Sequence, residues 1–206
     1  MSNNIIRLYH GTNLESAFNI AVNGIDLSKS EKYLDFGSGF YLTNDPVRAA
    51  ERAWQKVLML KQRCKTDTIA YMVELELDID IIEKLSVKKF ADSNDEWKQF
   101  VLSNRFTDKI IKQYNITEHN RDFKYDIVEG GIADGSISEI VFAINQGKQN
   151  LQDVDIKNLF TKDNKSLGFQ LSLHTPKALS CIKSISCDKI KMKNPYIPKK
   201  KVRRIL

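Results

Sequence analysis

Two short segments near the N-terminus place glycine inside strand-like runs of apolar residues. Leu8–Thr12 reads Leu-Tyr-His-Gly-Thr, and Asp35–Thr43 reads Asp-Phe-Gly-Ser-Gly-Phe-Tyr-Leu-Thr. Glycine weakens a strand, so its presence indicates a bulge or a place where another group must approach the backbone closely. Each segment also carries a polar ring, His10 in the first and Tyr41 in the second. We therefore expect two strands that form the walls of a ligand cleft.

The composition is that of an ordinary globular protein with a single domain. The chain has 206 residues, 42% hydrophobic and 28% charged, which suffices for a substantial buried core. No apolar run approaches the roughly 20 residues of a membrane helix, and the N-terminus lacks a signal-peptide pattern. The cysteines are odd in number and show no metal-ligand spacing: Cys64, Cys181 and Cys187. We therefore expect free thiols in a reducing compartment, which predicts a cytoplasmic protein without a bound metal.

The positive charge is concentrated at the C-terminus. The net charge is +6, but residues 189–206 hold eight basic side chains and no acidic one. We expect a folded, slightly acidic domain over residues 1–188, followed by a basic tail over residues 189–206. Such a tail could contact nucleic acid or an acidic partner, although a solvated end is the simpler interpretation.

Helical and strand-like patterns are interspersed along the chain, which predicts an α+β fold. Strands are expected at 5–9, 39–43, 68–77, 125–129, 168–174 and 184–192. Helices are expected at 14–23, 46–63, 95–104, 107–114, 136–145 and 177–182. Residues 25–32 are expected to form a loop, and residues 79–85 are ambiguous.

The first expected helix shows signals at both ends. Asn13 is suited to the N-cap and Gly24 to the C-cap. Leu14, Phe18 and Val22 recur four residues apart, which is the spacing of an amphipathic helix.

Five further phrases accompany the two glycine-containing segments. They are Gly24–Ser30, Asp95–Val101, Tyr125–Gly130, Ile132–Asp134 and Gln170–Thr175. Together with His-Gly-Thr and Gly-x-Gly-x-Tyr, these phrases resemble a bacterial group of unknown function, DUF3990. The same segments look like the NAD-binding half of the ADP-ribosyltransferase superfamily, and the closer likeness is to the branch of diphtheria toxin and the poly(ADP-ribose) polymerases. The resemblance runs from about residue 7 to residue 183. It implies a split β-sheet core surrounded by helices, over residues 1–188, with NAD as co-substrate.

The resemblance assigns NAD-binding roles to the two segments. The N–H and C=O of Gly11 would pair with the nicotinamide carboxamide, because a side chain there would obstruct the approach. His10 would donate a hydrogen bond to the adenosine-side ribose, and Thr12 would hold ribose or carboxamide. The ring of Tyr41 would stack on the nicotinamide. Gly39 would let the preceding loop turn tightly beside the cofactor.

The third position of the family pattern falls on the strand at 168–174, and Gln170 is the residue expected there. Many transferases carry Glu at this position, which helps to polarise the acceptor; Gln keeps the hydrogen bonding but cannot act as a base. Gln170 therefore favours transfer of a single ADP-ribose unit, or an acceptor that needs no enzyme base. The family also has a second stacking aromatic, but the matching position holds Arg52, and Trp54 lies nearby.

Several other side chains are candidates for the remaining roles. His174 shares a strand face with the third position and could activate an acceptor hydroxyl near pH 7, or cap the following helix. Asp126 and Asp134 could supply a carboxylate, although turn capping is the simpler interpretation. Lys29 and Arg48 could contact the pyrophosphate or be solvated surface charges.

These expectations lead to three functional hypotheses. The first is an NAD-dependent mono-ADP-ribosyltransferase that modifies a protein or nucleic-acid acceptor and releases nicotinamide. Family-level analogy adds a toxin of a toxin–antitoxin or phage-conflict system, with an antitoxin protein as a candidate partner. The second is an NAD glycohydrolase, and the third is a catalytically silent NAD or ADP-ribose binding module. An RNA 2′-phosphate transferase of the same superfamily is disfavoured, because the matching strands lack its set of basic residues.

Overall fold

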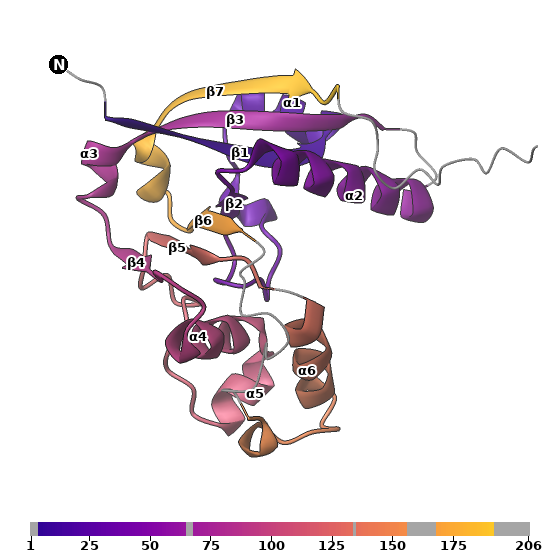
Figure 1. Cartoon of the computed structure of the whole chain (residues 1–206), viewed down its shortest axis with the longest axis vertical. Helices are drawn as coiled ribbons and strands as arrows, with labels where there is room; N and C mark the ends of the chain where they lie inside the picture. The colour runs from indigo at the N-terminus through magenta and orange to yellow at the C-terminus, as the bar shows by residue number, and fades with distance from the viewer. Residues whose placement is uncertain (1–3, 65–67, 134, 156–167, 192–206) are drawn as a thin grey trace, which may run out of the picture.

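Two β-sheets and a helical lobe make up the protein (Figure 1). The computed structural model describes residues 4–64, 68–133, 135–155 and 168–191. The three strands of the first sheet are, in order, β1 (Ile5–Asn13), β3 (Ala70–Asp78) and β7 (Ile182–Lys189). The four strands of the second are β2 (Phe40–Leu42), β6 (Phe169–Leu173), β5 (Ile127–Gly131) and β4 (Val87–Lys89). Neighbouring strands are antiparallel except β4 and β5, which are parallel.

The helices complete an α+β fold, as the sequence predicts. They are α1 (Leu14–Asn23), α2 (Pro46–Cys64), α3 (Ile79–Ile82), α4 (Asp95–Arg105), α5 (Asp108–Gln113) and α6 (Gly135–Asn145). The 3-10 helices η1 (Leu27–Lys29), η2 (Leu151–Asp153) and η4 (Ala178–Cys181) are shorter. In Figure 1, α2 runs along the first sheet, and α4, α5 and α6 form a lobe beneath the second. Within the described ranges, no helix has the length and apolar character needed to cross a bilayer.

The two sheets pack against each other through aliphatic side chains. Successive side chains of a strand alternate between its faces. Leu8 of β1 and Leu171 and Leu173 of β6 therefore meet in one buried cluster. The opposite face of β6 carries Gln170 and Ser172, and this polar face lies toward the helical lobe.

The lobe has its own aromatic core. Phe36, Trp97, Phe100 and Phe106 are each at most 2% exposed. The spacing of Trp97, Phe100 and Val101 on α4 predicts one apolar face, and all three side chains are buried. This core holds the loop that contains Phe36 beneath the polar face of β6.

The ends of α1 agree only in part with expectation. Gly24 ends the helix with a φ of 78°, and its N–H donates to the carbonyl of Ile20 at 3.0 Å. Asn13 occupies the N-cap position, but its side chain accepts no capping hydrogen bond. It is 4% exposed instead, because β1 continues to this residue.

The apolar stripe of α1 lies on the solvent side of the helix. Leu14, Phe18 and Val22 are 40%, 64% and 62% exposed, whereas Ala17 is buried. The thiol of Cys187 on β7 contacts the Ala17 carbonyl oxygen at 3.5 Å. A small residue therefore allows the close approach, and the three large apolar side chains stay outside the core.

Several element boundaries differ from the sequence-based expectation. β1 extends to Asn13 because it pairs with β3 along its whole length, and β4 was not expected. Residues 79–85 begin with α3, residues 25–32 contain η1, and the expected helix at 177–182 contains the 3-10 helix η4. Lys189 still pairs with Tyr71, so the boundary expected after residue 188 falls inside β7. Residues 192–206 of the expected tail lie outside the described residues.

Candidate functional site

The first and second sheets meet at a bridge between β1 and the end of β2. Tyr9 and Thr43 exchange both backbone hydrogen bonds, at 2.8 and 2.9 Å. In an antiparallel pair every second residue directs its N–H and C=O to the same edge, so Gly11 directs these groups toward the β2 side of β1, and Tyr41 directs its own toward β1. Within the described part of the chain, no backbone group bonds to Gly11 at this edge. The junction thus leaves one donor and one acceptor of Gly11 available where the sheets separate.

The ring of His10 on β1 forms a hydrogen bond to the backbone of β2. Its Nδ1 lies 2.8 Å from the carbonyl oxygen of Tyr41. A carbonyl only accepts hydrogen bonds, so Nδ1 carries the proton and Nε2 of the neutral ring is an acceptor. Burial lowers the pKa of His10 to about 4, against the opposing effect of the Tyr41 carbonyl, so the ring is neutral near pH 7. A ribose hydroxyl would then donate to His10, the reverse of the direction expected from the resemblance.

Gly11 is glycine because α2 crosses directly over it. A Cβ added there would lie 1.7 Å from the carbonyl oxygen of Ala49 and 2.8 Å from the backbone nitrogen of Ala53. The missing side chain therefore lets the helix approach the strand, while the peptide groups of Gly11 stay at the sheet edge. The neighbouring Thr12 is fully buried, and its Oγ1 has no hydrogen-bond partner among the described residues.

Tyr41 lies on the polar face of the second sheet, directly opposite Ser172. Its hydroxyl donates to the carbonyl of Gly37 at 2.7 Å and accepts from the N–H of Phe36 at 2.9 Å. Burial, reinforced by the nearby charge of Asp35, raises the pKa of Tyr41 well above its ordinary value. One ring face stacks on Phe36 at a centroid distance of 6.3 Å. The hydroxyl thus anchors the glycine-containing loop and sets the plane of the ring.

Gln170 lies two residues from Ser172 on β6, so it is the diagonal neighbour of Tyr41 on the same sheet face. Its Nε2 donates to Asp35 Oδ2 at 2.8 Å and to the Gly131 carbonyl at 3.0 Å. The side chain is 7% exposed. Tyr41 and Gln170 therefore share the face toward the helical lobe, whereas the ring of His10 packs on that of Phe40 with 4.4 Å between the ring centroids.

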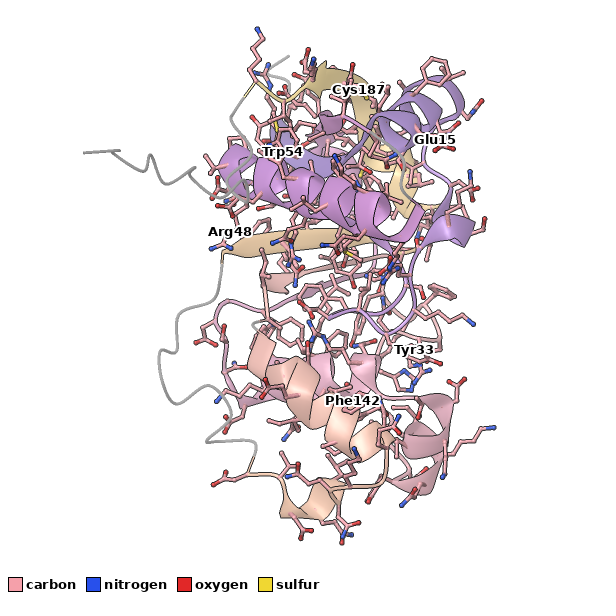
Figure 2. All side chains as sticks on the ribbon, turned by 90° about the vertical axis from the view of Figure 1, so that its right-hand side faces the viewer. Glu15, Tyr33, Arg48, Trp54, Phe142 and Cys187 are labelled. Atoms are coloured by element: carbon pink, nitrogen blue, oxygen red, sulfur yellow. The ribbon has the colours of Figure 1, made fainter. Side chains whose placement is uncertain are left out.

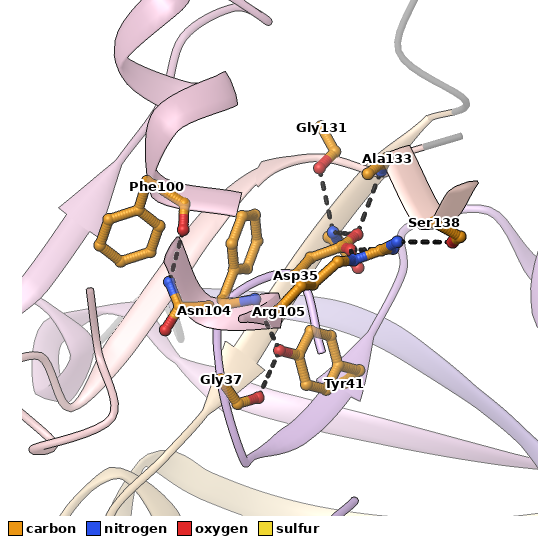
Figure 3. Close-up of polar contacts among 11 residues, drawn as sticks. Asp35, Gly37, Tyr41, Phe100, Asn104, Arg105, Gly131, Ala133 and Ser138 are labelled. Carbon is orange, nitrogen blue, oxygen red and sulfur yellow. Dashed lines mark hydrogen bonds and ion pairs between the residues drawn. The ribbon is translucent and has the colours of Figure 1, made fainter. Parts of the chain in front are cut away.

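Asp35 is a central residue of this site that the sequence analysis did not assign. Its carboxylate accepts from Arg105 Nε at 2.7 Å, forms an ion pair with Arg105 Nη2, and accepts from the Ala133 N–H at 3.1 Å (Figure 3). Arg105 also donates to the Ser138 hydroxyl at 2.8 Å. The available signal was its position at the head of the Gly-x-Gly segment. The partner Arg105 lies 70 residues away in sequence, so spacing could not reveal the pair.

His174 is enclosed rather than directed at the junction. Its Nδ1 donates to the Ser38 carbonyl at 2.7 Å, and its Nε2 accepts from the Ser172 hydroxyl at 2.7 Å. Burial lowers the pKa of His174 to about 4. A Cβ at Gly39 would lie 2.7 Å from the ring, so this glycine makes room for His174. The geometry assigns His174 to fastening the loop to β6, and no observation supports the expected role as a base.

The α2 positions do not provide a second stacking ring. Arg52 is exposed and bonds Gln55 at 3.3 Å. Trp54 packs in a cluster with Ile190 beyond β7, and Figure 2 shows it above α2, with Arg48 below the helix on the side of the second sheet. Arg48 approaches Gly168 at the start of β6, where a Cβ would lie 3.3 Å from its Nε.

The remaining charged candidates have local partners. Asp126 accepts from the Ser86 N–H at 3.0 Å and from the Thr175 hydroxyl at 2.6 Å. Burial opposes its ionisation, but these bonds hold the pKa of Asp126 below its ordinary value. Lys29 pairs with Asp26 on the surface at 3.8 Å, and Asp134 lies outside the described residues. Asp126 therefore ties β5 to the segment after β6 and does not reach Gln170.

The fold and the site define an α+β protein whose candidate ligand site lies where two sheets separate. The chain matches the model of a family described as a protein of unknown function, DUF3990, over residues 6–184. The protein therefore belongs to the DUF3990 family. No curated protein and no solved structure matches it.

Proposed function

We propose that the protein is an NAD-dependent mono-ADP-ribosyltransferase. The observation that carries this proposal is the hydrogen bond from His10 Nδ1 to the carbonyl of Tyr41, which joins the first glycine-containing segment to the second beside the β2-facing backbone edge of Gly11. Gln170 lies on the same face of the second sheet as the ring of Tyr41. These are the positions that the resemblance assigns to NAD.

The residues at the junction suit the parts of NAD. A carboxamide needs one donor and one acceptor, which the N–H and C=O of Gly11 supply. The aromatic face of Tyr41 offers stacking worth roughly 0.5–1.5 kcal/mol. Nε2 of His10 would accept from a ribose hydroxyl. Held in this way, the ribose is oriented for cleavage of its bond to nicotinamide.

The reaction breaks the bond between nicotinamide N1 and ribose C1′. The bonding electron pair leaves with neutral nicotinamide, and positive charge develops on the ribose, as in glycoside cleavage. A nucleophile of the acceptor then bonds to C1′ and loses its proton to solvent. Gln170 can accept a hydrogen bond near the developing charge but cannot take the proton. We therefore expect single-unit transfer to an acceptor that is already nucleophilic.

The test is incubation of the purified protein with NAD labelled on its adenylate side, in a bacterial lysate with and without nuclease. Nicotinamide release together with label on protein, or label lost on nuclease treatment, supports the transferase and gives the acceptor class. Nicotinamide release without macromolecular label identifies the glycohydrolase. Bound NAD without release identifies the silent binding module.

Matched variants connect any activity to the junction. His10→Ala and Tyr41→Ala should abolish nicotinamide release, with folding checked by circular dichroism. His119→Ala is the control, because this histidine lies beside Asp122 in the turn region before β5. Full turnover in either junction variant would contradict the proposal. Growth arrest on bacterial expression of the wild type, relieved by His10→Ala, would support the toxin role.

A further inference from the structure

The amide of Gln170 is held in one orientation by its neighbours. Both contacts of Nε2 are made to groups that only accept, the Asp35 carboxylate and the Gly131 carbonyl. Exchanging the amide oxygen and nitrogen would set three oxygen acceptors against one another, so the assignment follows from the network. Oε1 therefore points away from Asp35. Among the described residues, no hydrogen bond to Oε1 is found, and the side chain as a whole is 7% exposed.

The carboxylate of Asp35 is itself fixed by donors on its other sides. Arg105 supplies the compensating charge at Oδ1, and the Ala133 N–H shares Oδ2 with Gln170. Asp35 is only 6% exposed, and its partners come from α4, β6 and the segment after β5. A buried carboxylate with these contacts cannot rotate without leaving a donor unpaired.

We propose that Asp35 is a positioning residue that holds Gln170 with its oxygen toward the ligand and excludes glutamate from this position. The inference rests on the proposed function for the identity of the ligand, a ribose hydroxyl of NAD. Gln170 is then a specific acceptor that Asp35 requires, rather than a degraded form of the family's glutamate.

The physical reason lies in what Gln170→Glu would bring together. A carboxylate oxygen would replace Nε2 within 2.8 Å of Asp35 Oδ2 and 3.0 Å of the Gly131 carbonyl. Two carboxylates at such a distance cannot both ionise without a large penalty, so one binds a proton or the side chain turns away. Raising the pH removes that proton and restores the repulsion.

The experiment combines Gln170→Glu, Asp35→Asn and the double variant with the wild type. Unfolding is measured from pH 5.5 to 8 without NAD, and kcat and KM for nicotinamide release are measured with NAD. Gln170→Glu should lose stability relative to wild type as the pH rises, and the double variant should not. If the two substitutions acted independently, the kcat of the double variant relative to wild type would equal the product of the relative kcat values of the two single variants. We expect it to be about tenfold higher than that product, which is the size of coupling typical of contacting residues.

Asp126→Asn is the matched control, since it removes a buried carboxylate that does not contact Gln170. Its effects should add to those of Gln170→Glu without coupling. The proposal is overturned if Gln170→Glu matches the wild type in stability at every pH, or if its effect is independent of Asp35→Asn. If the wild type neither binds nor cleaves NAD, the proposed function fails, and the unfolding series still decides whether Asp35 orients the amide. If Asp35→Asn alone does not fold, the pH dependence of Gln170→Glu gives the same decision.

Discussion

His10 and Tyr41 are joined across the two sheets by a hydrogen bond of 2.8 Å from Nδ1 to the backbone carbonyl. The bond occupies one acceptor at the edge of β2 and fixes the tautomer of the ring. It also ties a residue of the first glycine-containing segment to a residue of the second. Beyond Tyr9 and Thr43, where the backbone bridge ends, the contact between β1 and β2 therefore depends on this side-chain hydrogen bond.

Stability should fall on acidification between pH 6.5 and 4 because of two buried histidines. The pKa values of His10 and His174 are lowered from 6.5 to about 4 in the folded protein. Between pH 6.5 and 4 these two histidines are protonated in the unfolded chain but neutral in the folded chain. The free energy of unfolding that they contribute above pH 6.5 is therefore lost as the pH falls. Each shift corresponds to roughly 3 kcal/mol by pH 4. Urea unfolding at pH 7.5, 6, 5 and 4 measures the loss.

The His174→Asn variant separates the two contributions. It should be less stable than the wild type at pH 7.5 but should lose less stability on going to pH 4. A wild-type free energy of unfolding that stays constant from pH 6.5 to 4 would contradict the assignment of neutral, buried rings.

Tyr41→Phe should separate the anchoring role of the hydroxyl from the stacking role of the ring. Loss of the hydroxyl leaves the Phe36 N–H and the Gly37 carbonyl without their partner, which should cost about 1–3 kcal/mol. The ring remains for stacking, so NAD binding should weaken less than in Tyr41→Ala. Calorimetric titration with NAD and thermal unfolding give the two quantities. Equal binding losses in both variants would show that the ring face does not contribute.

Gly11→Ala should be severely destabilising, at least about 3 kcal/mol, because the new Cβ would overlap the Ala49 carbonyl and force α2 away from β1. Gly24→Ala is the control, since nothing lies within 4 Å of its Cβ position and only the φ of 78° is unfavourable. Chemical denaturation measures the free energy of unfolding that each variant loses, and a larger loss in Gly11→Ala than in Gly24→Ala supports the close packing of α2 on β1. A Gly11→Ala protein as stable as Gly24→Ala would contradict the close approach of the helix.

The face of α1 can be tested with two substitutions one position apart. Phe18→Ser should change the free energy of unfolding by no more than about 0.5 kcal/mol, since the side chain is 64% exposed. Ala17→Leu should cost about 1–3 kcal/mol, because it adds atoms where α1 contacts β7. Thermal unfolding of both variants decides. The reverse order of losses would place the apolar stripe in the core.

The sequence predicts helix ends because these depend on the backbone conformation and contacts of a few neighbouring residues. Gly24 is predicted as the C-cap of α1, and it ends the helix there with a positive φ. The same signals could not tell which side of α1 is buried. Spacing identifies a shared face, but the partner surface of β7 accepted Ala17 in place of the larger stripe.

The sequence by itself determined the α+β class, most helix and strand positions, and the two glycine-containing segments with His10 and Tyr41. These depend on interactions within a few residues of the chain, so their spacing records them. Only the tertiary structure decided that α2 needs Gly11, that His174 is sealed, and that Asp35 orients Gln170 across 135 residues of sequence. Such contacts depend on how distant elements pack, and packing leaves no fixed spacing in the sequence.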